Sequence, residues 1–250
     1  MKKFRNLMFI LFLALTSIAS YAENIPKILI VLTSHSQLGD TGKRAGFWLS
    51  ELTHPYYRFK AEGYSVDIAS PLGGMAPMEP KSFDEPDEAN QRFLQDAQLM
   101  AKVIRTLPLA KINPDNYKAV VFAGGSGPMW DFPGNEHINR VAASIYESKG
   151  IVSAICHGPA ALIDIKLSNN EYLISGRKVT AITNEEEKDL NQMQILPFLL
   201  QDKLVERGAQ HIPGKPWQEN VVEDGRLITG QNPASAIKVA ERIIKYIQAN

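Results

Sequence analysis

Residues Val152–Leu162 read VSAICHGPAAL, and this stretch decides the fold. A buried, apolar strand-like run ends at Cys156, and Gly158-Pro159 then begins a helix, because proline is favoured in the first helical turn. A cysteine in that position matches a nucleophile elbow, the tight strand-to-helix turn that holds a reactive side chain above a sheet edge. The stretch therefore predicts an α/β protein with Cys156 as nucleophile, and a buried structural cysteine is the alternative.

Strand-like and helical segments alternate along the rest of the chain. Lys27–Thr33 (KILIVLT) has the continuous apolar run of a strand buried on both faces of a parallel sheet. The alternation predicts a single-domain three-layer sandwich, in which helices cover both faces of a mostly parallel sheet. The other expected strands are Tyr64–Ala69, Ala119–Ala123, Ile151–Ile155, Lys178–Ile182, and a hairpin of Val221–Val222 and Leu227–Thr229. The expected helices are Thr41–Glu62, Ala89–Arg105, Glu136–Lys149, one after Cys156, Met193–Arg207, and one from Pro233 to Ile247 that Asn232 caps. Residues Ser70–Asp87 are expected to form a long loop that lines or covers the site.

The composition narrows the class of protein. The chain has 250 residues, is 44% hydrophobic and carries 27 Lys+Arg against 27 Asp+Glu, which is ordinary for a globular protein. Zero net charge gives no electrostatic reason to expect a nucleic-acid partner. The single cysteine excludes a disulfide framework, and the other histidines show no paired spacing, so neither a metal nor a cofactor is expected.

The first 22 residues have the layout of a secretory signal. A basic start (MKKFR) precedes an apolar run from Leu7 to Ala19, and Ser20-Tyr21-Ala22 places small residues where a signal peptidase acts. We expect cleavage after Ala22, a mature domain of residues 23–250 with no membrane association, and a periplasmic or secreted location. An uncleaved anchor is the alternative.

Three features around Cys156 point to chemistry. The helix expected after it should lower the pKa of the thiol through its dipole. His157 is adjacent, and a catalytic histidine needs a partner that fixes its tautomer. The run Asn184-Glu185-Glu186-Glu187 supplies carboxylates for that purpose, although a solvated helix N-terminus explains it equally well. The turn Gly124-Gly125-Ser126-Gly127 follows a strand, and an N–H group from it and one from His157 are suited to an oxyanion hole.

Glu51 is a further candidate, on the first expected helix. Pro55 lies four residues on, so its ring should crowd the Glu51 carbonyl and distort the helix. A carboxylate turned toward the interior there is a functional candidate. From the residues alone, an exposed helix glutamate is the simpler interpretation.

Four motifs, in this order, resemble the ThiJ/PfpI superfamily, which has the flavodoxin-like fold of class I glutamine amidotransferases. They are SELTHPYYRF around Glu51, GGSG from Gly124, AICHGPAAL around Cys156 and LITGQNPASA near the C-terminus. The similarity runs from Ile28 to Ile247. It is strongest to the branch of the glyoxalase III enzymes and heat-shock chaperones.

The resemblance implies a role for each motif residue. Cys156 is the nucleophile with His157 beside it, and Glu51 acts as acid and base. The carboxylate that orients the histidine falls on Glu187, with Glu185 and Glu186 as alternatives in register. The oxyanion turn of the family falls on Gly125.

The implied activity is that of a glutathione-independent lyase, which converts methylglyoxal or a related 2-oxoaldehyde to lactate or a hydroxy acid. Its partners would be a small-molecule carbonyl substrate and, at most, a second copy of the chain in a homodimer. The alternatives are a cysteine hydrolase or peptidase, a protein deglycase, and a stress-related holding chaperone or redox sensor. A glutaminase is disfavoured, because that class needs a downstream histidine with an acid two residues later, and His211 is followed by Ile-Pro-Gly.

Overall fold

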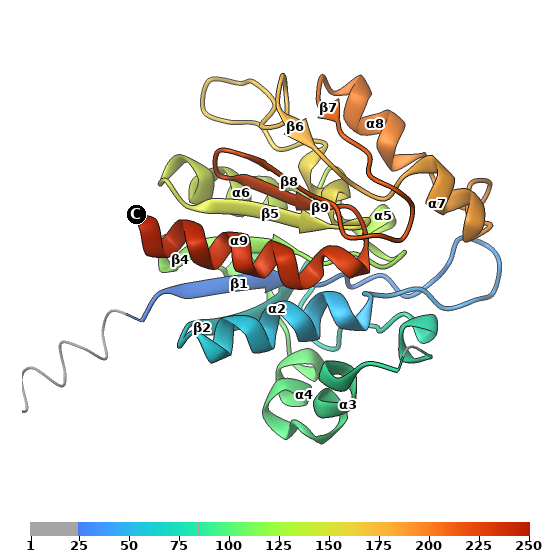
Figure 1. Ribbon diagram of the computed structural model, residues 1–250, viewed down its shortest axis with the longest axis horizontal. Helices are drawn as coiled ribbons and strands as arrows, with labels where there is room; N and C mark the ends of the chain where they lie inside the picture. Colours follow the sequence, from blue (N-terminus) through green and yellow to red (C-terminus); the bar gives the residue numbers. More distant parts are fainter. Residues whose placement is uncertain (1–24, 85) are drawn as a thin grey trace, which may run out of the picture.

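A seven-stranded sheet forms the centre of the computed structural model, which describes residues 25–84 and 86–250 (Figure 1). The strand order is β3-β2-β1-β4-β5-β9-β8, and every neighbouring pair is parallel except β8 and β9. The strands are β1 (Lys27–Val31), β2 (Ser65–Ser70), β3 (Leu107–Pro108), β4 (Tyr117–Phe122), β5 (Ile151–Ile155), β8 (Val221–Asp224) and β9 (Leu227–Gly230). The predicted α/β fold with a mostly parallel sheet is confirmed, and so is the predicted hairpin.

The central strand shows why the sequence folds this way. Ile28–Leu32 are fully buried, because β1 pairs with β2 on one side and β4 on the other while helices cover both faces. Such a strand has no solvent-facing side, so its residues are apolar without alternation.

Helices cover both faces of the sheet. The helices α2 (Leu49–Ala61) and α9 (Ala236–Ala249) pack side by side in front of it, and α6 (Glu136–Glu147) lies behind it (Figure 1). Asn135 caps α6 by accepting from the N–H groups of His137 and Ile138. No helix within the described ranges is long and apolar enough to cross a membrane. The expected signal peptide lies outside the described residues.

Two expected helices begin or break at places that the sequence pattern did not predict. The helix expected from Thr41 begins only at Leu49, because the residues before it bind neighbouring loops; Phe47, for example, pairs with Met78. The helix expected over Ala89–Arg105 is two helices, since the Asp96 side chain accepts from two backbone N–H groups and starts a new one. These helices are α3 (Glu88–Gln95) and α4 (Ala97–Ile104).

Four more expectations are wrong in detail. Only one turn of 3₁₀ helix, η4 (Gly158–Leu162), follows Cys156. The segment expected as a strand from Lys178 pairs in a separate two-stranded sheet. Asn232 precedes Pro233 as expected, but its side chain accepts no backbone N–H; its oxygen accepts from the Ser235 hydroxyl, and its amide donates to Glu186. The helix expected from Met193 begins only at Leu200. The elements in this second half of the chain are β6 (Lys178–Val179), α7 (Asn184–Asp189), α8 (Leu200–Glu206), β7 (Gln210–His211) and η5 (Pro233–Ser235). The remaining short elements are η1 (Pro80–Phe83), η2 (Leu109–Lys111), η3 (Pro114–Asn116) and α5 (Pro128–Asp131).

Substitution of Gly158 tests how tightly the turn after β5 packs against β4. A Cβ atom at this position would lie 2.1 Å from the carbonyl oxygen of Phe122, so we expect Gly158→Ala to destabilise the fold by about 3 kcal/mol through overpacking. Gly134→Ala is the matched control, since its Cβ would meet open space and only the positive φ of 68° would cost about 1 kcal/mol. Urea unfolding midpoints measure both, and equal midpoints would contradict the packing argument.

Candidate active site

Cys156 occupies the strained backbone position of a nucleophile elbow. Its φ is +60°, a conformation that non-glycine residues rarely adopt. The residue is buried, with 3% of its surface exposed. Two backbone hydrogen bonds hold it: its N–H donates to Gly230 O at 2.9 Å, and its carbonyl accepts from Ile182 N–H at 3.1 Å. Strain of this kind persists only where the surrounding structure fixes it, and it is concentrated at functional sites.

His157 connects the thiol to a carboxylate. Its Nδ1 lies 3.4 Å from Cys156 Sγ, and its Nε2 lies 2.8 Å from Oε1 of Glu187, with both side chains of the ion pair buried. An ionised carboxylate only accepts, so Glu187 fixes the proton on Nε2 and leaves Nδ1 free to take the thiol proton. Of the three alternatives in register, Glu187 is therefore the one that contacts the histidine. Glu185 is exposed to solvent.

Glu186 is buried for a structural reason. Its carboxylate forms a capping box with Thr183 at the start of α7. It also accepts from the Trp217 backbone N–H and from the side-chain amides of Gln231 and Asn232. One buried acid thus joins three loops around the site, which sequence reasoning did not anticipate.

Glu51 faces the protein interior. It is fully buried, and its Oε2 accepts from the Gly124 N–H at 2.7 Å. The interpretation of Glu51 as an exposed helix residue is therefore wrong. Pro55 lies inside α2, which continues through this residue as far as Ala61.

The environment of Cys156 raises the pKa of its thiol, contrary to the expectation from the sequence. Burial is the largest cause and the charge of Glu51 the next, with Glu186 and Glu187 acting in the same direction. The short η4 helix has too few aligned peptides to reverse this. A mechanism that uses this thiol as a nucleophile therefore needs a base to take its proton.

Gly125 supplies an N–H group at the thiol. It hydrogen-bonds the sulfur and so opposes the rise in the thiol pKa. Its φ is +91°, and a Cβ there would lie 2.3 Å from Gly46 O, so only glycine fits. The His157 N–H donates to no acceptor within residues 25–84 and 86–250, as an oxyanion hole requires.

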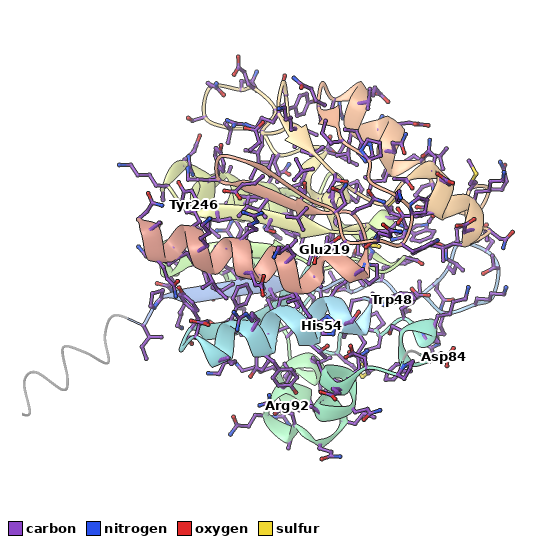
Figure 2. All side chains as sticks on the ribbon, in the orientation of Figure 1. Trp48, His54, Asp84, Arg92, Glu219 and Tyr246 are labelled. Atoms are coloured by element: carbon purple, nitrogen blue, oxygen red, sulfur yellow. The ribbon has the colours of Figure 1, made fainter. Side chains whose placement is uncertain are left out.

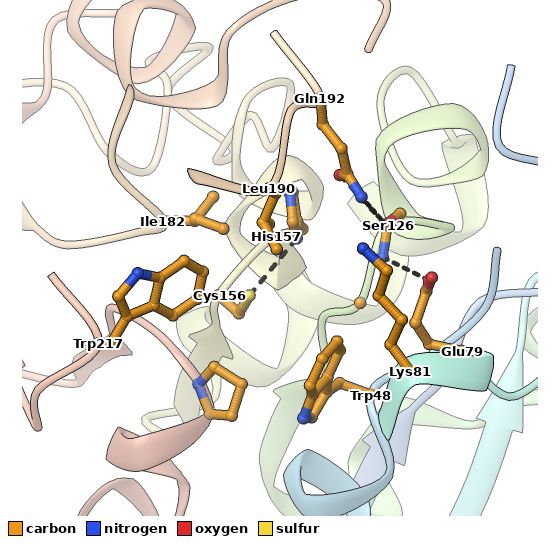
Figure 3. A pocket seen from close by; sticks show the side chains of 12 residues that line it. Trp48, Glu79, Lys81, Ser126, Cys156, His157, Ile182, Leu190, Gln192 and Trp217 are labelled. Carbon is orange, nitrogen blue, oxygen red and sulfur yellow. Dashed lines mark hydrogen bonds between the residues drawn. The ribbon is translucent and has the colours of Figure 1, made fainter. Parts of the chain in front are cut away.

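Cys156 is one of the residues that line a narrow pocket (Figure 3). Glu79, Ser126 and Gln192 line one part of the pocket, where Ser126 lies between the other two (Figure 3). Trp48 stands at the N-terminal end of α2 (Figure 2). The remaining lining residues are Lys81, Gly125, Cys156, His157, Ile182, Leu190, Trp217 and Pro233.

Sequence reasoning missed Trp48, Glu79, Gln192 and Trp217. The expected lining loop Ser70–Asp87 does reach the pocket, through Glu79 and Lys81. No periodicity or motif around these residues could have singled them out. Within the ranges that the structure describes, no group of three His, Cys, Asp or Glu side chains is arranged to hold a metal ion.

The structure therefore brings Cys156, His157, Glu187, Glu51 and Gly125 together at the carboxyl end of β4 and β5. Each comes from a different segment of the chain except for the adjacent pair.

Comparison with known proteins agrees with this arrangement. The model of the DJ-1/PfpI family matches residues 44–246. The chain is 32% identical over 243 residues to Glyoxalase 3 of Candida albicans (90% of this chain, 99% of that one), and 32% identical over 238 residues to the glutathione-independent glyoxalase HSP31 of Saccharomyces cerevisiae (89% and 98%). The X-ray structure of Rapid Encystment Protein 24 kDa from Francisella tularensis superposes with a TM-score of 0.86 at 41% identity, covering 88% of this chain and 98% of that one. The chain belongs to the DJ-1/PfpI family, in the branch that includes the glutathione-independent glyoxalases.

Proposed function

We propose that this protein is a glutathione-independent glyoxalase, a lyase that converts methylglyoxal or a similar 2-oxoaldehyde to a 2-hydroxy acid. The observation that carries the proposal is the pairing of two buried groups at one sulfur: Glu51, whose charge reaches the thiol, and the Nδ1 of His157 at 3.4 Å. A hydrolase needs one base for its nucleophile. An internal transfer of hydrogen between two carbons also needs a base at the carbon, and we assign that task to Glu51.

The first step is addition of the thiol to the aldehyde. His157 Nδ1 takes the thiol proton as the S–C bond forms, and Glu187 stabilises the resulting imidazolium through Nε2. The carbonyl oxygen becomes an oxyanion that the N–H groups of Gly125 and His157 bind. Return of the proton from His157 to this oxygen gives the hemithioacetal.

The second step moves hydrogen from one carbon to its neighbour. Glu51 removes the proton from the former aldehyde carbon, which leaves an enediolate; the hydroxyl proton of the hemithioacetal then moves to the neighbouring oxygen, and Glu51 returns its proton to the adjacent carbon. The first carbon is thereby oxidised to a thioester, and the second is reduced to an alcohol. Water attacks the thioester, the C–S bond breaks, and lactate leaves with the thiol restored. The net reaction adds one water and needs no external oxidant or cofactor.

The burial of Cys156 speaks against the redox-sensor alternative. Thiols that sense oxidants are exposed and have a low pKa, whereas this residue is 3% exposed and its environment raises the thiol pKa. The same thiol suits a mechanism that forms the thiolate only when substrate is present.

We expect Cys156→Ala and Glu51→Gln each to lower the conversion of methylglyoxal to lactate by about 100-fold or more, because one removes the nucleophile and the other the carbon base. The measurement is lactate formed by residues 23–250 without glutathione. Glu62→Gln, at the end of α2 and away from the pocket, is the control. A wild-type protein that forms no lactate would overturn the proposal.

The three consecutive glutamates allow a test of the histidine partner. In Glu187→Gln the side-chain amide can donate to Nε2, which permits the proton on Nδ1, so we expect activity to fall about 100-fold. The neighbouring Glu185→Gln alters an exposed side chain and should keep wild-type rates. Equal rates for the two variants would exclude Glu187 as the residue that orients His157.

We also propose that the chain is exported and cleaved after Ala22, since its first residues have the three-part layout of a signal. Full-length protein expressed in a bacterium should appear in the periplasmic fraction with Glu23 as its first residue, as measured by intact mass. Ala22→Lys, which places a large charged residue at the cleavage position, should block processing. Recovery of the uncleaved chain from the cytoplasm would contradict this.

A further inference from the structure

Each backbone N–H group in the turn Gly124–Gly127 has its own acceptor. Gly124 donates to Glu51 Oε2, Gly125 to the sulfur of Cys156, Ser126 to Glu79 Oε2 and Gly127 to Gly46 O. Because the amides on both sides of Gly125 are bound elsewhere, its N–H alone points at the thiol. Two buried carboxylates, from α2 and from the long loop after β2, therefore set the direction of one N–H bond.

Glu79 fastens this turn to the segment before α2. Its Oε2 accepts from Ser126 N–H at 3.2 Å and from Gly46 N–H at 3.1 Å, and its side chain is buried. Its backbone N–H also donates to Phe47 O at 2.8 Å. A Cβ at Gly46 would lie 2.3 Å from the Pro77 carbonyl oxygen, so the segments meet this closely only because residue 46 is glycine.

The other side of the turn is fixed by a second contact. The hydroxyl of Ser126 lies 3.2 Å from Nε2 of Gln192, just beyond α7, the helix that carries Glu187 (Figure 3). Ser126 is thus held by Glu79 through its backbone and by Gln192 through its side chain. Both contacts hold the residue that follows Gly125 in the turn.

We propose that Glu79 is a positioning residue, whose carboxylate holds the turn Gly124–Gly127 so that the Gly125 N–H stabilises the oxyanion formed at Cys156. This inference rests on the proposed function, because the hemithioacetal oxyanion is the group that this N–H would bind. Glu79 acts through the geometry of its acceptor oxygen, and its negative charge is not required.

If Glu79 acted on Cys156 only as a nearby negative charge, its removal would change the thiol pKa in the opposite direction. Loss of a negative charge near Cys156 favours the thiolate and lowers the thiol pKa. Loss of the Gly125 hydrogen bond to sulfur raises it, because that bond favours the thiolate. The direction of the change in thiol reactivity therefore separates the two roles.

Three variants of Glu79 test the proposal. Glu79→Gln keeps an oxygen that can accept both N–H groups and removes the charge, Glu79→Asp keeps the charge and shortens the reach, and Glu79→Ala removes both. Ser82→Ala is the matched control: its hydroxyl donates to the Glu79 carbonyl at 2.6 Å, so it loosens the same loop and leaves the carboxylate in place. The two measurements are the rate of alkylation of Cys156 by iodoacetamide at a fixed pH below the thiol pKa, and lactate formation from methylglyoxal.

We expect alkylation to slow about tenfold in Glu79→Ala and Glu79→Asp, equivalent to a rise of about one unit in the thiol pKa. Their kcat should fall about 100-fold, as when one oxyanion donor is lost, while KM stays within about threefold of wild type. Glu79→Gln and Ser82→Ala should stay within about threefold of wild type in both measurements. Faster alkylation in Glu79→Ala, or a Glu79→Gln variant as impaired as Glu79→Ala, would overturn the proposal, as would losses of the same size in Ser82→Ala.

Alkylation keeps this test separate from the proposed reaction. If the wild type forms no lactate but Glu79→Ala and Glu79→Asp still slow alkylation while Glu79→Gln does not, the glyoxalase assignment fails and the role of Glu79 in aiming the Gly125 N–H at the sulfur stands. If lactate forms and alkylation is the same in all the variants, the proposed function stands and the role of Glu79 fails.

Discussion

The left-handed backbone conformation of Cys156 is the constraint on which the rest of the structure depends. A φ of +60° ends β5 abruptly and turns the chain back over the sheet, so that Gly158 meets the carbonyl of Phe122 with no room for a side chain. The same turn places the His157 N–H and the Cys156 thiol next to each other beyond the end of β5. Strain of this size, of order 1–3 kcal/mol, is tolerated because neighbouring strands and loops bind the backbone on both sides of the cysteine.

The second organising feature is a group of buried glutamate side chains around the site. Glu51, Glu79, Glu186 and Glu187 are all buried around the site. Backbone N–H groups, side-chain amides and one imidazole satisfy them, as the hydrogen bonds show. Burial raises the pKa of Glu79, and its hydrogen bonds from Ser126 and Gly46 oppose that rise.

The sequence was most informative where local rules govern the structure. The alternation of buried strands and helices predicted the sheet, and the elbow around Cys156 was visible because a strand, a lone cysteine and a Gly-Pro helix start stand together. Glu187 needed the family resemblance, since three consecutive glutamates look alike until the capping box of Thr183 takes Glu186. Glu79 and Trp217 were out of reach, because their roles depend on contacts between loops that lie far apart in the chain. The direction of the thiol pKa was mispredicted for a similar reason: a helix dipole is a local property, whereas burial and the charges around the sulfur come from the whole fold.

The pairing of β5 with β9 has a consequence for the order of events on the ribosome. The hydrogen bond from Cys156 N–H to Gly230 O closes a separation of more than seventy residues. Strand β5 therefore emerges long before the neighbour that fixes its last residue, and a parallel pairing over this distance forms slowly. The strained turn gains that anchor only after Gly230 has been synthesised. A chain that stalls before Gly230 would carry Cys156 without the hydrogen bond that fixes its backbone N–H.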